Sequence, residues 1–443
     1  MQFFSSFPRA RHLAPRFVVA LMLMAVLAAC GSNSSSGSSS TTTTGPVTLT
    51  FWSWVTGIDK SVALWNKSHP DIQVKLANVG SGPAEYNKLY TAIKANNEPD
   101  LGQVEFQLLP TFETTGGLVD ISQYGTDSVK DQFVPWTWKQ VSLGNAVYAI
   151  PQDSGPMAMF YRDDIFKKYN LSVPTTWAQY ADVAAKLHAA DANEYITDFP
   201  PKQPGWFTGL MWQAGGHLFG INGQSWQVSI NNSASQQVAS YWQDLISKKL
   251  VKTEPDFDNA WYHDLQTGAV ATWVTGVWGA GTITSNAPQT SGKWRVAPLP
   301  QWQAGQTADG NWGGSTTTVF KSSKHPKEAA EFAIWLNTNQ QSLDEMIKGN
   351  NIYPAYQPAL ASPLVNGPIP FFGNQAINQV FKEGSTHVNA DFQWGPTIDQ
   401  VYNDMSDNFA NAVNGKGTLV DALNTVQQST MTFMKKQGFS VTS

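Results

Sequence analysis

VTLTFW (residues 47–52) alternates apolar and polar side chains, which is the pattern of a β-strand with one buried face. The pattern returns in IQVKL (72–76), and a mostly apolar run at 101–109 is a third candidate strand. The two intervening segments place apolar residues on one helical face: Ile58, Val62 and Trp65, then Tyr86, Leu89, Tyr90 and Ile93. This alternation of strands and helices predicts a parallel sheet with crossover helices, and hence an α/β fold.

The second half of the chain continues in the same style. Thr176 is expected to cap a helix, and Pro326 is expected to begin another. Thr418 and Asp421 have the spacing of a capping box before a third helix. The chain has 443 residues, more than one average domain of roughly 100–200 residues holds, so two lobes are predicted.

The first thirty residues have the features of an export signal. Arginines are followed by the apolar run FVVALMLMAVLAA (17–29), whose length suits a signal peptide and falls short of a membrane span. The run ends in LAACG, which resembles the bacterial lipoprotein signal, where a lipidated cysteine becomes the mature N-terminus. We therefore expect a signal peptide at 1–29, lipidation of Cys30 and a flexible Ser/Thr tether at 30–46. The alternative is an ordinary secretory signal cut after Ala29, with the cysteine as a bystander.

The composition favours a neutral ligand. The net charge is −5 and no stretch concentrates Lys and Arg, so a nucleic-acid partner is not expected. Charged residues make up only 14%, whereas the chain holds 18 Trp and 13 Tyr, and such a surface suits a hydroxyl-rich ligand better than an ionic one. The seven histidines are scattered and Cys30 is the only cysteine, so no metal and no cofactor are predicted. The sequence contains neither the G-x-S-x-G motif of hydrolases nor a phosphate-binding G-x-x-x-x-G-K loop.

Several short stretches carry a resemblance to a known family. They are LTFWSW (49–54), WNKSHPDIQV (65–74), PD before a strand (99–100), GGLVD (116–120), GNAVYAIPQD (144–153) with FYRDDIF (160–166), and PTTW (174–177). In this order they resemble the family-1 extracellular solute-binding proteins, the maltose-binding-like sugar receptors of ABC importers, and the resemblance covers residues 47–438. The departure is YRD (161–163), where the family usually has Tyr-Asn-Lys or Tyr-Asn-Arg. It leaves the fold prediction intact.

The resemblance implies a type II periplasmic-binding-protein fold, with two α/β lobes, three crossings between them and a ligand cleft at their junction. The N-terminal lobe is expected at 47–154 and 315–365, and the C-terminal lobe at 155–314 and 366–443. The implied ligand is a carbohydrate, and the many aromatic residues favour an oligosaccharide. The implied partner is the permease of an ABC importer, and no enzymatic activity is implied. The lipid on Cys30 would hold a monomer at the outer face of the cytoplasmic membrane.

A sugar site needs aromatic plates for the apolar ring faces and polar groups for the hydroxyls at the ring edges. Residues of both kinds stand near the expected cleft. The predicted ligand-binding residues are Trp54, Glu105, Gln107, Asp153, Ser154, Trp206, Trp278, Trp312, Gly313, Tyr353 and Trp394.

Three tryptophans are chosen by resemblance. Trp278, in TGVWG, matches the family's G-x-W stacking aromatic and is the main candidate, with a place in the core as the alternative. Trp206 and Trp394 stand where the family has further aromatics in the cleft. Trp54 and Glu105 are chosen because they follow strands, and ligand sites in open α/β sheets lie at the carboxyl ends of the strands.

The remaining candidates lie at the expected crossings. Asp153 and Ser154 are at the first crossing, and Trp312 and Gly313 at the second, where the glycine serves backbone bending. Tyr353 is a candidate contact further along the chain. Each polar residue has a competing interpretation as a cap, a turn or a surface group.

Two other functions remain open at this stage. A secreted glycoside hydrolase is also rich in aromatics and needs two carboxylates, for which Glu105 and Asp153 are the candidates. The family-like stretches, however, leave no room for a separate catalytic domain. A polysaccharide-binding adhesin could use the same fold without transport.

Overall fold

The computed structural model describes residues 45–350 and 352–443. The predicted signal peptide (1–29), Cys30 and tether residues 30–44 lie outside the described residues. The first described element is the strand β1 (Val47–Trp52), in the place that its alternating pattern predicts.

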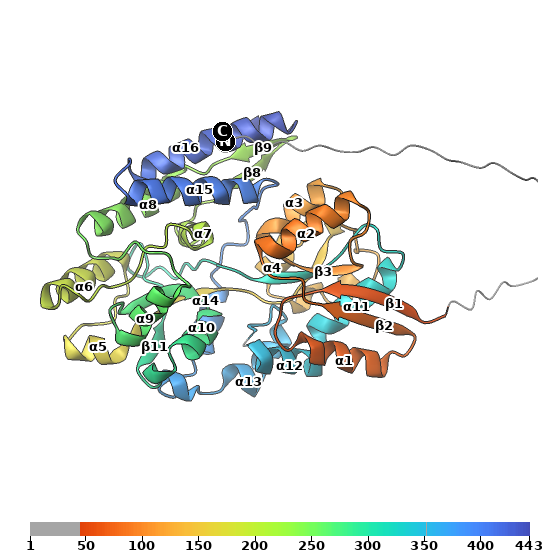
Figure 1. Cartoon of the computed structure of the whole chain (residues 1–443), viewed down its shortest axis with the longest axis horizontal. Coiled ribbons are helices and arrows are strands. Elements are labelled where there is room, and N and C mark those ends of the chain that lie inside the picture. The colour runs from red at the N-terminus through yellow and green to blue at the C-terminus, as the bar shows by residue number, and fades with distance from the viewer. Residues whose placement is uncertain (1–44, 351) are drawn as a thin grey trace, which may run out of the picture. The chain divides into compact units, whose positions relative to one another are not determined.

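A five-stranded sheet has the order β2-β1-β3-β12-β6 (Figure 1). β1 pairs in parallel with β2 on one side and with β3 on the other, which confirms the predicted parallel arrangement. β12 comes from far along the chain and runs antiparallel between β3 and β6. The remaining bounds are β2 (Ile72–Ala77), β3 (Leu101–Glu105), β6 (Ala149–Pro151) and β12 (Ser315–Val319).

Helices cover both faces of this sheet (Figure 1). On one face, Trp65 and Phe332 pack edge to face at 5.3 Å, and Phe332 meets Phe51 of β1 at 5.6 Å. On the other face, Phe112 stacks on Tyr90 at 4.9 Å. The helices are α1 (Ile58–Ser68), α11 (Pro326–Thr338) and α12 (Gln340–Asn350) on the first face, and α2 (Pro83–Lys94) and α3 (Leu109–Thr114) on the second.

The third strand is shorter than the predicted range of 101–109. β3 ends at Glu105, Phe106–Leu108 form a 3₁₀ turn, and α3 begins at Leu109 with Pro110 in its first turn. Proline favours the first turn of a helix because its fixed φ fits and its missing N–H is not needed there. A short apolar run alone does not distinguish a buried strand from a buried helical turn.

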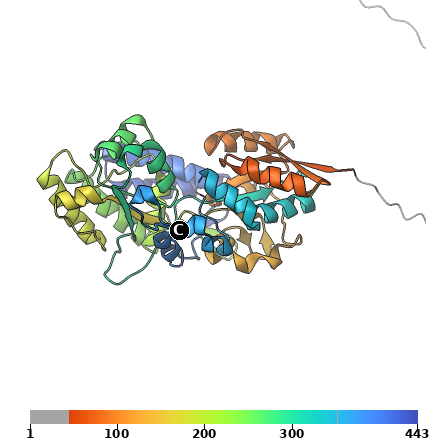
Figure 2. The same ribbon diagram turned by 90° about the horizontal axis from the view of Figure 1, so that it is seen from below.

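A second sheet has three antiparallel strands in the order β10-β7-β11, and it lies in the other half of the molecule (Figures 1 and 2). Helix α14 packs on the central strand β7, and Tyr180 of α6 hydrogen-bonds Thr272 of β10 at 2.6 Å. The bounds are β7 (Met157–Arg162), β10 (Thr272–Gly276), β11 (Trp294–Ala297), α5 (Asp163–Lys168), α6 (Trp177–Ala190), α9 (Asn259–Thr267), α10 (Gly279–Asn286) and α14 (Asn378–Ser385).

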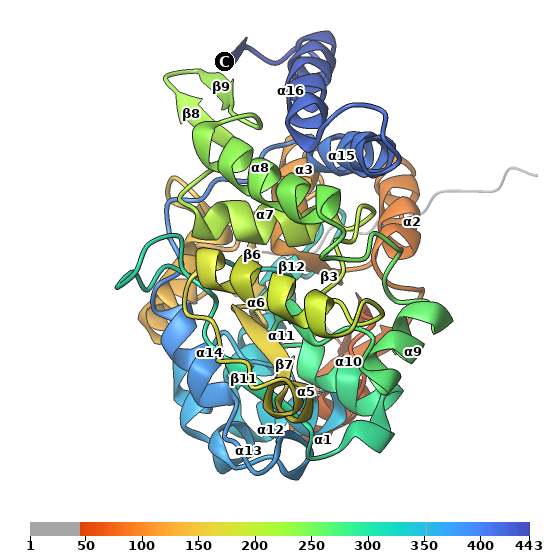
Figure 3. The same ribbon diagram turned by 90° about the vertical axis from the view of Figure 1, so that its left-hand side faces the viewer.

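The chain ends in a helical layer in which α15 and α16 pack together and α16 lies on α8 (Figure 3). The predicted capping box is confirmed, because Thr418 accepts from the N–H of Asp421 and Asp421 accepts from the N–H of Thr418. The predicted cap at Thr176 is confirmed as well. The bounds are α7 (Pro204–Gln213), α8 (Ser233–Ser247), α15 (Ile398–Val413) and α16 (Leu419–Lys436), with a small sheet of β8 (Phe219–Asn222), β9 (Ser225–Val228) and β13 (Val441–Thr442).

Short elements complete the connections. They are the hairpin β4 (Ser142–Leu143) and β5 (Ala146–Val147) and the helices α4 (Pro135–Gln140) and α13 (Pro363–Asn366).

Two segments connect the first sheet with the second and lie side by side. One runs from β6 to β7 and the other leads into β12. The N–H of Trp312 donates to the carbonyl of Gly155 at 2.9 Å, and the N–H of Gly155 donates to Asn311 Oδ1 at 2.8 Å. A Cβ at position 155 would lie 2.0 Å from the Trp312 carbonyl oxygen, so only glycine allows this approach. Gly313 and Gly314 adopt φ angles of 92° and 94°, which L side chains disfavour.

Within residues 45–350 and 352–443, no helix is long and apolar enough to cross a membrane. The same residues contain no group of three or more His, Cys, Asp or Glu side chains placed to hold a metal ion.

Candidate functional site

A cavity of about 300 Å³ lies where the end of β3 faces helix α15, and we call it the β3–α15 cavity. Its walls come from α2, β3 and the turn after it, the start of α7, the segment before β12, and α15. The lining residues are Tyr86, Glu105, Gln107, Leu108, Lys202, Gln203, Pro204, Gly205, Asn311, Trp312, Gly313, Trp394, Asp399, Tyr402, Asn403 and Ser406.

Glu105 is the polar residue that β3 delivers to the cavity. It is the last residue of a parallel strand, and such strand ends are where ligand sites form in α/β sheets. The hydroxyl of Tyr86 donates to Glu105 Oε2 at 2.9 Å and accepts from the Glu105 N–H at 3.2 Å. Burial raises the pKa of Glu105, and the nearby negative charge of Asp399 adds to that rise, although the tyrosine hydrogen bond opposes it.

A second carboxylate enters from the opposite wall. Asp399 lies in the first turn of α15, and its Oδ2 accepts a hydrogen bond of 2.6 Å from the hydroxyl of Tyr90. Tyr86 and Tyr90 are four residues apart on α2, so one helical face supplies both hydroxyl partners. Burial raises the pKa of Asp399 as well. The cavity therefore holds two carboxylates, each already oriented by a tyrosine.

Trp312 forms an aromatic wall of the cavity. A Cβ at Gly205 would lie 2.8 Å from Trp312 Nε1, so the glycine lets the indole approach the start of α7. Trp278 holds the ring from behind, because its Nε1 donates to the Trp312 carbonyl at 2.8 Å and the two rings meet edge to face at 4.7 Å. The row continues from Trp278 to Trp273 at 5.5 Å and from Trp273 to Trp261 at 4.9 Å. The Trp312 ring is held rigidly because the tryptophans behind it are packed into the core.

Trp394 forms a second aromatic wall. The residue is 5% exposed, and its ring meets Phe392 at 4.8 Å and Trp212 at 6.0 Å, both edge to face. Among the described residues, Trp394 Nε1 has no hydrogen-bond partner. Buried polar groups usually find a partner, and this donor has none within the described part of the chain.

The cavity thus brings together five of the eleven predicted ligand-binding residues: Glu105, Gln107, Trp312, Gly313 and Trp394. Trp278 does not line the cavity but supports Trp312 from behind. Trp54 is half-buried and packs edge to face on Tyr86 at 6.1 Å. It therefore contacts a lining residue but does not line the cavity itself.

Asp153, Ser154 and Tyr353 lie at the connection between the sheets. Asp153 Oδ1 accepts from the N–H and the hydroxyl of Ser315 at 2.8 and 2.6 Å. Burial raises the pKa of Asp153 to about 6, which those hydrogen bonds partly offset. The N–H of Ser154 donates to the carbonyl of Tyr353 at 3.0 Å. These contacts tie three chain segments together outside the cavity lining.

Trp206 lies in the core, in a position unlike that of the other predicted aromatics. It is 2% exposed, its Nε1 donates to the carbonyl of Val274 at 2.9 Å, and its ring packs on Trp242 at 4.9 Å. Its helix, α7, contributes Pro204 and Gly205 to the cavity instead.

The sequence reasoning missed the wall that α15 provides. Asp399, Tyr402, Asn403 and Ser406 have the spacing i, i+3, i+4, i+7, so they form one polar face of the helix. The opposite face is buried through Val401, Met405 and Phe409. This polar face, which includes a tyrosine, is the sequence feature that could have predicted that α15 lines a ligand site. The apolar pattern of α2 places Tyr86 on the buried face of the helix, which gives no indication that its hydroxyl reaches Glu105.

A cavity at the strand ends of a two-sheet α/β fold, with aromatic and polar walls, is the arrangement of a two-lobed, type II solute-binding protein. The chain matches the sequence profile of the bacterial extracellular solute-binding proteins over residues 52–342, and it belongs to that family.

Two relatives of the chain are sugar-binding proteins. The chain is 26% identical to the arabinooligosaccharide-binding protein of Bacillus subtilis (strain 168), over 73% of this chain and 76% of that protein. It is 24% identical to the lactose-binding protein of Rhizobium radiobacter, over 84% of this chain and 89% of that protein.

Solved structures show the same fold. The galacto-N-biose-/lacto-N-biose I-binding protein of an ABC transporter from Bifidobacterium longum, in complex with lacto-N-biose, matches with a TM-score of 0.81 and 31% identity, covering 90% of this chain and 99% of that one. The ABC transporter associated binding protein of B. animalis subsp. lactis, in complex with β-1,6-galactobiose, matches with a TM-score of 0.79 and 29% identity, covering 90% of this chain and all of that one. The family and these relatives are binding proteins, not enzymes.

Proposed function

We propose that the chain is the substrate-binding component of an ABC importer and that it captures a short oligosaccharide in the β3–α15 cavity. The observation that carries the proposal is the make-up of that cavity: aromatic walls at Trp312 and Trp394 stand beside two carboxylates, Glu105 and Asp399, that tyrosines orient. Aromatic rings cover the apolar faces of sugars, and oriented carboxylates accept from ring hydroxyls.

The relatives support the ligand class. Two solved relatives above 25% identity hold disaccharides, and two further relatives are lactose-binding and arabinooligosaccharide-binding proteins. Glu105 and Asp399 can accept hydrogen bonds from sugar hydroxyls. Sites of this kind discriminate strongly, because a ligand that lacks the matching hydroxyl leaves buried polar groups unpaired.

Capture would proceed by closure of two lobes, one of residues 47–154 and 315–365 and the other of residues 155–314 and 366–443. The hydrogen bond from Tyr90 to Asp399 would then join the two lobes across the cavity mouth. Gly155 and Gly313, in the adjoining connecting segments, would absorb the hinge rotation. Small-angle scattering with and without sugar tests closure, and an unchanged radius of gyration on saturation contradicts it.

The decisive measurement for the ligand is calorimetry of the purified protein with lacto-N-biose, β-1,6-galactobiose, lactose and arabinooligosaccharides. At least one sugar should bind, and Glu105→Gln should weaken that binding because the amide carries no charge to strengthen the hydrogen bonds. The exposed Glu331→Gln, on α11, is the control and should leave affinity unchanged. Failure of every oligosaccharide to bind refutes the proposed ligand class.

The same samples separate a receptor from a hydrolase. Reducing ends should stay constant during long incubation with the bound sugar. Turnover that Glu105→Gln or Asp153→Asn abolishes would instead make those residues the carboxylate pair of a glycosidase.

We also propose that a lipid on Cys30 anchors the protein outside the cytoplasmic membrane, where it delivers sugar to the permease as a monomer. The lipoprotein-like LAACG sequence supports this. Cys30→Ala should release the protein into the soluble fraction without changing its sugar affinity. Mass spectrometry that finds an unmodified Cys30 in the mature protein contradicts the anchor.

A further inference from the structure

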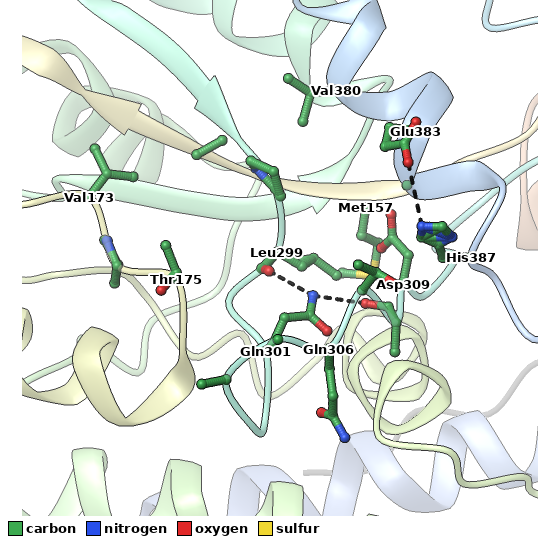
Figure 4. A pocket seen from close by; sticks show the side chains of 18 residues that line it. Met157, Val173, Thr175, Leu299, Gln301, Gln306, Asp309, Val380, Glu383 and His387 are labelled. Carbon is green, nitrogen blue, oxygen red and sulfur yellow. Dashed lines mark hydrogen bonds and ion pairs between the residues drawn. The ribbon is translucent and has the colours of Figure 1, made fainter.

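A second cavity, of about 430 Å³, lies between helix α14 and the segment that follows β11, and we call it the α14 cavity (Figure 4). Its volume falls within the range of roughly 300–1,000 Å³ that is usual for small-molecule sites. None of its lining residues belongs to the β3–α15 cavity. They are Met157, Val173, Pro174, Thr175, Ala297, Pro298, Leu299, Gln301, residues 304–309, Val380, Glu383, Gly384 and His387.

One wall of the α14 cavity is aliphatic. Val173 and Val380 are partly open to solvent, whereas Leu299 is 3% exposed and Ala297 is 9% exposed. No Trp, Tyr or Phe is among the lining residues. This wall suits a compact aliphatic group and lacks the aromatic plates that a sugar ring needs.

The α14 cavity has acceptors at Asp309, Gln301 and Glu383, and groups that can also donate at Thr175, Gln306, Thr307 and His387. Asp309 is 5% exposed, and among the described residues its carboxylate accepts from the N–H of Gly310 at 2.7 Å and from the backbone of Met157 but forms no ion pair. Gln301 is 9% exposed, and both hydrogen bonds of its Nε2 go to carbonyls, those of Leu299 and Ala308, at 2.9 Å each. Gln301 Oε1 has no partner among the described residues. Glu383 adds a third acceptor at the rim, next to His387 (Figure 4).

A ligand that satisfies the acceptor atoms of Asp309 and Gln301 must donate hydrogen bonds. Asp309 lies against the backbone of α14, since a Cβ at Gly384 would come within 1.9 Å of its Oδ2. A buried carboxyl without a cation is costly, and burial raises the pKa of Asp309 well above its usual value. An ammonium group would supply both the missing charge and the missing donors.

We propose that the α14 cavity binds a small aliphatic amine, with its ammonium group at Asp309 and Gln301 and its apolar body against Val173, Leu299 and Val380. This site is separate from the proposed sugar site and does not depend on it.

Cyclohexylamine and cyclohexanol are matched probes, because they have one shape and differ in charge. Binding of each to the whole chain is measured by calorimetry at about pH 8, where the amine is fully protonated. Cyclohexylamine should bind at least about tenfold more tightly, since a charged donor facing a buried carboxylate forms the stronger hydrogen bond.

Asp309→Asn should remove this difference, because the amide keeps the acceptor for the Gly310 N–H and loses the charge. Val380→Phe, on the half-buried face of α14, should weaken both probes by filling the cavity. Glu331→Gln, on α11 outside both cavities, is the control and should change neither. Thermal melting verifies that each variant is folded.

Equal affinity for the two probes, an unchanged preference in Asp309→Asn, or no binding of cyclohexylamine at millimolar concentration overturns the proposal. If Asp309→Asn does not fold, the Val380→Phe result decides: unchanged binding of cyclohexylamine then places the probe elsewhere.

Discussion

The β3–α15 cavity and the α14 cavity hold their carboxyl groups in opposite ways. In the β3–α15 cavity, Glu105 and Asp399 each accept from a tyrosine of α2. In the α14 cavity, Asp309 accepts only from the backbone and Gln301 Oε1 has no partner among the described residues. The first cavity is therefore organised before a ligand arrives, and a neutral ligand need only add to existing hydrogen bonds. The second contains acceptors that a donating ligand would satisfy.

The two cavities also show that the volume of a cavity and the chemistry of its lining are independent. The α14 cavity is the larger of the two, at about 430 Å³ against about 300 Å³, yet it lacks the aromatic walls of the smaller one. Volume alone therefore does not identify a site with the aromatic walls that suit a sugar. Which side chains line a cavity, and which of their polar atoms are already paired, decides what it can bind.

The largest effect is expected from Trp312→Ala. Losing the aromatic wall should cost about 2–4 kcal/mol of sugar-binding free energy, or roughly thirty- to a thousand-fold in affinity, as for a buried aromatic anchor. Trp335→Ala is the matched control, because Trp335 is half-buried on α11 and packs on Trp65 away from both cavities. Calorimetry with the tightest-binding sugar measures both. Equal losses in the two variants would mean that truncation acts through stability alone.

The pre-paired carboxylate is tested by a double-mutant cycle of Tyr86→Phe and Glu105→Gln. If the 2.9 Å hydrogen bond orients Glu105 for the ligand, the two losses of sugar affinity should be non-additive, with a coupling free energy of about 1–2 kcal/mol. Additive losses would show that tyrosine and glutamate contact the ligand independently, and the distinction between the two cavities would weaken.

Glu85 lies on α2, the helix that supplies Tyr86 and Tyr90, and its carboxyl group adds a third case to the comparison. Glu85 is fully buried, neither of its oxygens has a partner among the described residues, and burial raises its pKa to about 8 despite the nearby charge of Lys88. The folded state therefore holds a proton that the unfolded state releases near its pKa of about 4.3. Stability should fall as the pH rises from about 4 through about 8, because the folded state binds more protons in that range.

Glu85→Gln keeps the neutral form and removes this proton. The difference in melting temperature between about pH 5 and about pH 8 should shrink, and at the higher pH the variant should gain about 1 kcal/mol relative to the wild type. A residual slope of the same sign should remain, because burial also raises the pKa values of Asp256 and Glu113 to about 7. Thermal melts in both buffers measure it, and an unchanged difference contradicts the assignment to Glu85.

The smallest effect is expected at the mouth of the β3–α15 cavity. Lys202 pairs with Asp407 at 2.9 Å, but both side chains are largely exposed. Exposed ion pairs contribute about 0–1 kcal/mol, so Lys202→Gln should change sugar affinity less than about fivefold. The sugar affinity of the Lys202→Gln variant should be the same in titrations at low salt and at high salt. A larger loss would mean that the lysine contacts the ligand directly.

The fold was predictable because its first half follows simple patterns. Alternation in 47–52 and 72–76 and the amphipathic faces of α1 and α2 led to the parallel β2-β1-β3 arrangement. The insertion of β12 between β3 and β6 was not visible locally, because it depends on pairing across more than 150 residues. The 3₁₀ turn after Glu105 was missed because a short apolar run fits either structure.

The site was predictable where chain position implied it. Glu105 and Gln107 follow a strand end, and Trp312 lies in a connecting segment, so topology placed them in the cavity. Packing decided the rest. Trp206 and Trp278 differ from Trp312 only in which neighbours cover them, and a single sequence does not reveal that. Asp399 required knowing that α15 faces β3, a relation between segments almost 300 residues apart.

The row of indoles behind the cavity also makes the molecule report optically on its own occupancy. Trp312, Trp278, Trp273 and Trp261 have successive ring separations of 4.7, 5.5 and 4.9 Å, at steep mutual angles. At such spacing excitation can pass between neighbouring indoles along the row. A ligand that covers Trp312 changes the environment at one end of this antenna, and emission from the whole row responds without any attached dye.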